Sequence, residues 1–274
     1  MNYLHAYHAG NHTEVFKHAA LVKVLLRVKQ KMTPIAFIDT HAGLGITDLQ
    51  SPEALRTGEA QLGIMKVIGK DCPVAQPYFD IIRSYNGDGT LRRYPGSVAI
   101  ARALLSSDDQ IVACELQDTA HKTLKTLFKN ERNIAIHHRD GYEAMQALIP
   151  PRQRRGVVFI DPPFEDKDEM NRLTKSLTNG LKKWPSGVFV GWYPIKDRFA
   201  GRALVEGLLG IGATKLLSVE FVPFPNDRQR LAGSGLVFCN TPWKLDEDMR
   251  WLCKGLHRAF GIASGRWSVS WPGE

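Results

Sequence analysis

Short apolar runs that alternate with helical segments restrict the fold of this chain more than any other feature. Seven runs have the length and composition of buried strands, and the alternation with helical segments continues through the fifth. The runs lie in 35–45, 110–116, 133–144, 156–164, 187–195, 215–223 and 233–243. Such alternation is typical of a mostly parallel sheet covered by helices. We therefore expect an α/β fold with a seven-stranded, mostly parallel sheet whose last two strands form an antiparallel edge hairpin.

The stretch 48–93 differs from the rest of the chain. It contains helix-like pieces and a turn-rich end, but no convincing buried strand. We interpret it as a helical insertion subdomain within one domain made of 1–47 and 94–274. Upstream, Asn11 with Glu14 three residues later is the pattern of a capping box, which predicts a helix starting near Asn11.

The charge balance favours an anionic partner. The chain has 36 Lys and Arg against 28 Asp and Glu, a formal net charge of +8. Nucleic acid is a common partner of such a surface, although on charge alone an ordinary basic surface is an equally good interpretation. No apolar run approaches the roughly 20 residues that cross a bilayer, and the amino terminus lacks the pattern of a signal peptide. We expect a cytoplasmic protein with no membrane contact, and nothing in the sequence demands more than a monomer.

Acidic residues follow four of the predicted strands. Asp39, Glu115, Asp140 and Asp161 come at or just after strand ends, where ligands bind in open α/β sheets. A carboxylate such as Glu115 suits the hydroxyls of a ribose, and Asp140 suits an adenine amino group. The turn after the first strand lacks the G-x-G-x-x-G pattern of pyrophosphate sites. The set therefore favours an adenosyl cofactor without a diphosphate, while each acid taken alone is better explained as a helix cap or a solvated loop residue.

The tetrapeptide DPPF at 161–164 is the strongest chemical signal. Two prolines after a buried strand cannot continue a ladder and hold the chain extended. Asp161 and the Pro162 carbonyl then offer two acceptors for the two hydrogens of an amino group. Phe164 offers a face on which a flipped base can stack. The alternative interpretation is a strand that ends in proline, followed by a core phenylalanine.

Several segments together resemble one family. DPPF is similar to the D/N-P-P-Y/F motif of S-adenosylmethionine-dependent amino-methyltransferases. The resemblance to the RlmJ-type 23S ribosomal RNA adenine-N6 methyltransferases covers almost the whole chain and is weaker in the insertion. It is carried by HAGNHTEVFKH, DTHAGLG, RTGE, YPGS, GYEAMQALIPPRQRRGVVFIDPPF, GWYP and SGLVFCNTPW. The resemblance implies a Rossmann-like class I methyltransferase fold that uses S-adenosylmethionine and releases S-adenosylhomocysteine.

The resemblance also implies roles for individual residues. Cofactor contacts would fall on Lys17, His18, His41, Gly43, Ser97, Glu115, Asp140, Gly141 and Asp161. Asp161, Pro162 and Phe164 would form the catalytic motif, and Tyr3, His5 and Phe164 would contact the substrate. The family motif has Tyr where this chain has Phe164, which keeps the stacking face and loses a hydroxyl.

The implied reaction is methyl transfer to the exocyclic N6 of a flipped adenine in large-subunit ribosomal RNA, either naked or in an early assembly particle. Asp161 and the Pro162 carbonyl would orient the amine towards the sulfonium methyl group. Two alternatives stay open at this point: an amino-methyltransferase for DNA adenine or a protein amide, and a non-catalytic RNA-binding protein with a relic cofactor fold. The histidines at 5, 8, 12 and 18 suggest a metal only weakly, since no metal-binding pattern accompanies them, and we expect no metal.

Overall fold

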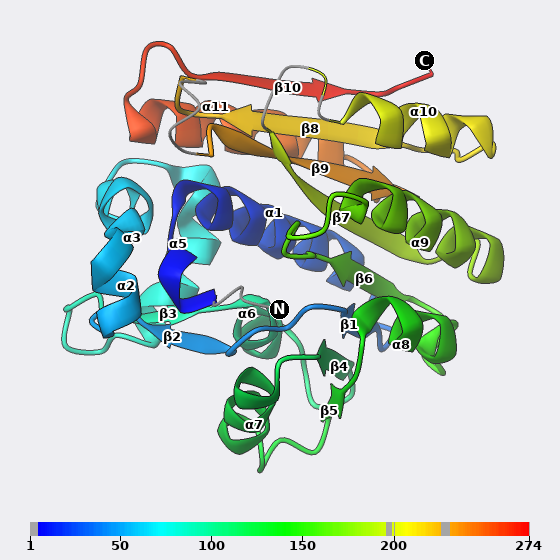
Figure 1. Ribbon diagram of the computed structural model, residues 1–274, viewed down its shortest axis with the longest axis horizontal. Helices are drawn as coiled ribbons and strands as arrows, with labels where there is room; N and C mark the ends of the chain where they lie inside the picture. Colours follow the sequence, from blue (N-terminus) through cyan, green and yellow to red (C-terminus); the bar gives the residue numbers. More distant parts are fainter. Residues whose placement is uncertain (1–4, 196–198, 200, 226–230, 274) are drawn as a thin grey trace.

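The computed structural model describes residues 5–195, 199, 201–225 and 231–273. A central sheet of eight strands runs through the molecule (Figure 1). In spatial order the strands are β5 (Ile134–His138), β4 (Gln110–Glu115), β1 (Ala36–Asp39), β6 (Gly156–Ile160), β7 (Val188–Ile195), β9 (Gly233–Cys239), β8 (Leu217–Val222) and β10 (Arg266–Ser270). The first five are parallel, and β9 lies antiparallel between β7 and β8. The predicted α/β fold with a mostly parallel sheet is confirmed.

The predicted strand count was wrong by one strand, β10. The antiparallel β8–β9 pair exists, but β10 pairs antiparallel with β8 and occupies the edge of the sheet in place of the predicted hairpin. In the sequence RWSVS only Val269 is buried. An edge strand that is half exposed needs no continuous apolar run, so it carried no signal of the kind that identified the other seven.

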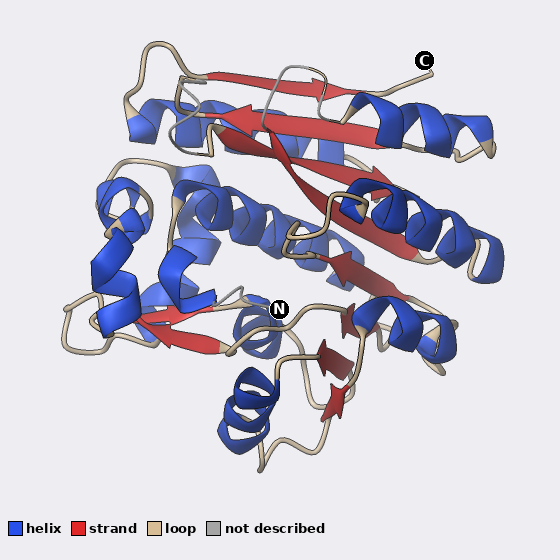
Figure 2. Cartoon of the chain, in the orientation of Figure 1, coloured by secondary structure: helices blue, strands red, loops and turns tan. Residues whose placement is uncertain are grey.

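Helices cover both faces of the sheet, and each layer has its own apolar core (Figure 2). One layer contains α1 (His12–Lys29), α6 (Ser97–Leu104), α7 (Asp118–Leu127) and α11 (Leu245–Phe260). The other contains α8 (Gly141–Leu148), α9 (Glu169–Lys183) and α10 (Arg202–Gly210). Among the described residues, no helix has both the length and the apolar character needed to cross a bilayer.

Helix α1 is the element that carries the amino-terminal part of the chain into the site. Its N-cap is Asn11, as predicted, whose side chain accepts a hydrogen bond from the Glu14 backbone N–H at 2.8 Å. The Glu14 side chain accepts in turn from the Gly10 backbone N–H at 2.8 Å. Most of α1 is buried, because it packs against both α6 and α11. Its first turn is therefore held rigidly beside the ends of the central strands.

The insertion begins and ends with a strand pair that the sequence did not predict. β2 (Ile46–Asp48) and β3 (Arg93–Pro95) pair antiparallel at its base. Between them lie α2 (Pro52–Thr57), α3 (Glu59–Leu62), α4 (Ile64–Val67), the 3₁₀ turn η2 (Pro73–Ala75) and α5 (Gln76–Ser84). Buried side chains of α4 and α5, including Ile64 and Phe79, belong to the same apolar core as α1 and α11. The division into 1–47 with 94–274 and an insertion 48–93 remains a prediction.

Candidate active site

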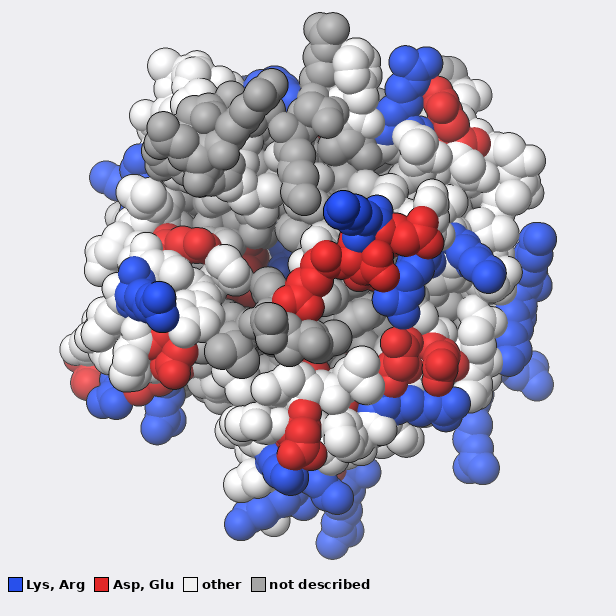
Figure 3. All heavy atoms as spheres, in the orientation of Figure 1, with Lys and Arg blue, Asp and Glu red and all other residues white. Residues whose placement is uncertain are grey.

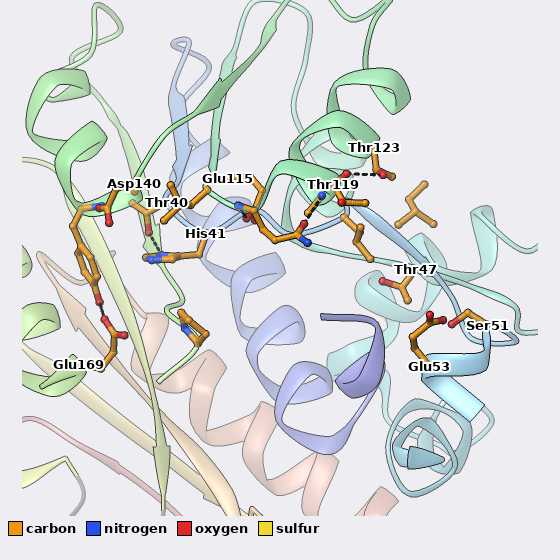
Figure 4. A pocket seen from close by; sticks show the side chains of 18 of the residues that line it. Thr40, His41, Thr47, Ser51, Glu53, Glu115, Thr119, Thr123, Asp140 and Glu169 are labelled. Atoms are coloured by element: carbon orange, nitrogen blue, oxygen red, sulfur yellow. Dashed lines mark hydrogen bonds between the residues drawn. The ribbon is translucent and has the colours of Figure 1, made fainter. Parts of the chain in front are cut away.

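A cavity of about 370 Å³ opens where β1, β4 and β5 end, and we call it the strand-end cavity. It is lined by Glu115, Asp140 and Gly141, and by His41 in the loop after β1. Figure 4 shows the side chains of His41, Glu115 and Asp140 towards one end, with Thr47, Ser51 and Glu53 at the other. The structure thus brings together four of the residues that the sequence analysis assigned to a cofactor.

Glu115 fixes two loops at the floor of this cavity. Its Oε2 accepts a hydrogen bond from the Gly43 backbone N–H at 2.8 Å, and its Oε1 accepts from the Gln117 N–H at 2.7 Å. Burial raises the pKa of Glu115, and the backbone donors oppose that shift. Each carboxylate oxygen has a further lone pair, so Glu115 retains acceptor capacity for hydroxyl groups of a ligand.

Asp140 and Gly141 form the opposite wall. Asp140 is the N-cap of α8 and accepts hydrogen bonds from the Tyr142 and Glu143 backbone N–H groups at 2.9 and 3.2 Å. The helix-cap interpretation of Asp140 is therefore correct, and the residue lines the cavity as well. A Cβ atom on Gly141 would lie 1.9 Å from the Thr40 carbonyl oxygen. Only glycine allows α8 to approach the β1 loop this closely.

His41 lies between this cavity and its neighbour in the neutral form. Burial lowers its pKa to about 4. Its Nδ1 is 2.7 Å from Thr40 Oγ1, and its ring contacts the Tyr142 ring edge-on at 5.1 Å. A neutral imidazole offers one donor and one acceptor to a ligand, and it adds no charge to a site that already holds several carboxylates.

A smaller cavity of about 30 Å³, the junction cavity, lies between His41 and Asp161. Ser97 lines it and donates a short hydrogen bond to Asp39 Oδ2. His18 also lines it, with Nδ1 2.9 Å from the Tyr94 hydroxyl. Asp39 is fully buried, and burial raises its pKa to about 7. The sequence analysis placed Asp39 at a strand end but did not assign it to the site, although its position at the strand end was a usable signal.

The DPPF segment separates the junction cavity from a third cavity of about 680 Å³, the DPPF cavity. Asp161 lines both. Its Oδ2 is 2.5 Å from Lys17 Nζ, and both side chains are largely buried. Burial raises the pKa of Asp161, and Lys17 opposes that shift. Lys17, which the resemblance assigned to the cofactor, contacts the proposed catalytic carboxylate, and its contact with a cofactor remains a prediction.

Phe164 lies in the wall of the DPPF cavity in a conformation that few side chains adopt. Its φ of 53° lies in the left-handed region, which is uncommon for a bulky residue and is found mostly at functional sites. Its ring meets the Trp192 ring edge-on with centroids 5.6 Å apart. On the other side Lys17 Nζ lies 5.1 Å from the Trp192 ring centroid. Trp192 therefore connects Phe164 to the Lys17–Asp161 pair.

The remaining walls of the DPPF cavity come from segments far apart in the chain. They are contributed by Glu14 of α1, Thr57 and Leu62 of the insertion, and Trp192 and Phe224 near the ends of β7 and β8. The sequence analysis did not predict any of these five. The GWYP segment that contains Trp192 was noted only as part of the family resemblance.

The insertion holds the amino-terminal segment against this cavity. Glu59 accepts from Asn11 Nδ2 at 2.8 Å and lies 3.0 Å from His8 Nδ1. His5 belongs to a 3₁₀ turn, η1 (His5–His8), but the structure does not describe its side chain, and Tyr3 lies outside the described residues. Over the described ranges, no group of three or more His, Cys, Asp or Glu has the arrangement of a metal site.

The strand order, together with a divided cavity at the strand ends, defines a class I methyltransferase fold. A structure titled as a probable spermidine synthase from Corynebacterium glutamicum shares this fold, with a TM-score of 0.53 at 10% identity over 97% of this chain and 77% of that one. A crystal structure of a protein from Legionella pneumophila is far more similar. Its TM-score is 0.89 at 28% identity, over 96% of this chain and 98% of that one.

The family is also shown by sequence. The family model described as "Ribosomal RNA large subunit methyltransferase D, RlmJ" matches residues 32–272, and the chain belongs to this family. Two proteins named "Ribosomal RNA large subunit methyltransferase J", from Escherichia coli and Haemophilus influenzae, are each 34% identical to it. Each comparison covers 99% of this chain and 98% of the relative.

Proposed function

We propose that the chain transfers a methyl group from S-adenosylmethionine to the exocyclic N6 of a specific adenine in 23S ribosomal RNA. One observation carries the proposal: Asp161 lines both the junction cavity, which shares His41 with the strand-end cavity, and the DPPF cavity. A residue in this position touches two ligands at once. Methyl transfer needs the donor and acceptor atoms in direct approach, and a residue that borders both cavities marks the place where they would meet.

The strand-end and junction cavities suit S-adenosylmethionine. Glu115 would accept hydrogen bonds from the ribose hydroxyls, and Asp140 would accept from the adenine amino group. Gly43, His41 and Gly141 would complete the adenosine side, and Lys17, His18, Ser97 and Asp161 the methionine side. When bound, the cofactor supplies an electrophilic methyl group on its sulfonium.

The DPPF cavity would receive the target adenine after it has left the base stack. Phe164 offers it a ring face, and Tyr3 and His5 would contact it from the amino-terminal segment. Asp161 and the Pro162 carbonyl would accept the two amino hydrogens and draw the nitrogen towards a tetrahedral geometry. Its lone pair would then point at the junction cavity, and both acceptors would lie where positive charge develops.

Ribosomal RNA as substrate rests on the names of the relatives from Escherichia coli and Haemophilus influenzae. The formal net charge of +8 is consistent with a nucleic acid partner. Among the residues drawn in colour, Figure 3 shows Lys and Arg side chains mostly around the periphery of this face, with acidic side chains between and inside them. We propose a monomer that acts in the cytoplasm on naked or early-assembly RNA.

The test is methyl transfer from radiolabelled S-adenosylmethionine to deproteinised large-subunit RNA, with small-subunit RNA and duplex DNA in parallel. We expect label in large-subunit RNA alone. Label in DNA would replace the proposed substrate with DNA adenine. No label in any polymer, despite binding of S-adenosylhomocysteine, would favour a protein amide as substrate. RNA binding without cofactor binding would instead indicate a non-catalytic protein.

A further inference from the structure

Lys17 lies where it opposes the proposed chemistry. Its Nζ is 2.5 Å from Oδ2 of Asp161, the residue whose carboxylate would accept a hydrogen from the target amine. The amine nitrogen becomes positive during methyl transfer, and a positive charge a few ångströms away in a buried site raises the free energy of that state. The reaction would proceed faster if the ammonium of Lys17 had another partner while Asp161 holds the amine.

Glu14 is placed to be that partner. It lies three residues before Lys17 on α1, a spacing that puts two side chains on the same face of a helix. Like Asp161, it lines both the junction cavity and the DPPF cavity. Its hydrogen bond from the Gly10 N–H uses Oε2 and fixes the carboxylate in the cavity wall.

The charges around Glu14 support this arrangement. Burial raises its pKa to about 7, and Lys17 opposes the shift while Asp161 adds to it. The groups that face it are Lys17 on its own helix, His8 from η1, Asp161 after β6, Tyr78 from α5 and Tyr94 from β3. Of these groups, Lys17 is the one that forms an ion pair with Asp161, the proposed catalytic carboxylate. The Lys17 ammonium therefore contacts Asp161 directly and also interacts electrostatically with Glu14.

We infer that Glu14 is a positioning residue that receives the Lys17 ammonium when the target amine docks on Asp161. The exchange moves the positive charge away from Asp161, one turn along α1, and leaves both oxygens of that carboxylate available to the amine. No bond is made or broken in this step. The inference rests on the proposed function, because it concerns the same Asp161.

The test is Glu14→Gln, measured with the full chain and large-subunit RNA. Glutamine keeps an acceptor oxygen for the Gly10 N–H but cannot hold an ammonium as a carboxylate does. We expect kcat to fall at least about ten-fold, with KM for RNA and affinity for S-adenosylhomocysteine changed less than about three-fold. Glu220→Gln is the matched control, since Glu220 is a half-buried carboxylate bonded to Tyr193 away from all three cavities, and its kcat should stay at the wild-type value.

A double-mutant cycle shows whether Glu14 acts through Lys17. In a Lys17→Met background, measured in single turnovers, Glu14→Gln should have no further effect. Glu14→Asp, which keeps the charge, should recover part of the rate. The wild-type kcat should fall as pH drops below about 7, where Glu14 takes up a proton, and this acid limb should disappear in Glu14→Gln.

The outcomes separate this inference from the proposed function. If the wild-type chain methylates no RNA, the proposed function fails. If the wild type is active but Glu14→Gln retains its kcat, or lowers it equally with and without Lys17, the inference about Glu14 is wrong and the proposed function stands. If Glu14→Gln does not fold, two other measurements test the inference: the kcat of Glu14→Asp and the fall of the wild-type kcat below pH 7. A Glu14→Asp kcat equal to that of the wild type, together with a wild-type kcat that does not fall below pH 7, would overturn the inference.

Discussion

The strand-end cavity and the DPPF cavity are built in different ways. The first takes its key residues from loops that directly follow β1, β4 and β5, and backbone N–H groups hold its carboxylates Glu115 and Asp140. The second takes its walls from α1, the insertion, the DPPF loop and the ends of β7 and β8. There the carboxylate of Asp161 is held by the side chain of Lys17.

The difference separates a fixed site from an adjustable one. Backbone N–H donors at loop ends and helix caps have no side-chain torsions of their own, so they move only together with the element that carries them. A lysine side chain has several rotatable bonds and can change partner within a folded protein. We therefore expect substitutions in the DPPF cavity to change turnover, and substitutions in the strand-end cavity to change cofactor affinity and stability.

The largest effect is expected for Asp161→Asn. The amide loses the negative charge that stabilises the developing cation, and one of its two terminal atoms becomes a donor. We expect kcat to fall by about 100-fold or more, with affinity for S-adenosylhomocysteine changed by no more than about three-fold. Single-turnover methylation and calorimetry would measure the two quantities, with the exposed Asp166→Asn as control. Near-normal turnover would remove Asp161 from the mechanism.

Phe164→Ala removes the face on which the target base would stack. Stacking on an aromatic ring contributes about 1–3 kcal/mol per base, so we expect kcat/KM for RNA to fall about 30-fold. Phe164→Tyr keeps the ring and restores the residue of the family motif, and it should stay close to wild type. An unchanged kcat/KM in the alanine variant would mean that the base lies elsewhere in the cavity.

Gly141→Ala tests the close approach that shapes the strand-end cavity. The new Cβ would lie 1.9 Å from the Thr40 carbonyl oxygen, so α8 has to shift. We expect unfolding free energy in urea to fall by about 2 kcal/mol and cofactor affinity to fall with it. Gly69→Ala is the control, because nothing lies within 4 Å of its added Cβ. Equal unfolding free energies in the two variants would show that α8 can shift away from Thr40 at little cost in stability.

The last prediction concerns the pH dependence of stability that Asp39 confers and involves no change in turnover. Burial raises its pKa from 3.8 to about 7, so folding takes up a proton between these values. Stability from this group is present at low pH and is lost as pH rises towards 7. Relative to wild type, Asp39→Asn should therefore gain about 3 kcal/mol of unfolding free energy between pH 4 and pH 7, since one unit of pKa shift corresponds to about 1.4 kcal/mol. A constant difference across that range would mean that Asp39 is already ionised in the folded protein.

The same contrast explains what the sequence predicted. Glu115, Asp140 and Asp161 follow apolar strands directly, so the strand pattern and the rule that ligands bind at strand ends were sufficient to group them. Glu14 and Trp192 reach the site through the packing of α1 and β7, which no local pattern encodes. The contact between Lys17 and Asp161 joins residues 144 positions apart, and the family resemblance assigned Lys17 to the cofactor. β10 was missed because a half-exposed edge strand resembles a loop.

The proposed mechanism requires that Asp161 and the Pro162 carbonyl bind an exocyclic amino group of the target base. The most direct measurement is to digest the methylated large-subunit RNA to nucleosides and identify the product by mass spectrometry against synthetic standards. The account predicts N6-methyladenosine and no other labelled nucleoside. Methylation at a ring nitrogen, at a ribose hydroxyl or on another base would contradict it, because Asp161 and the Pro162 carbonyl would then have no amino hydrogens to accept.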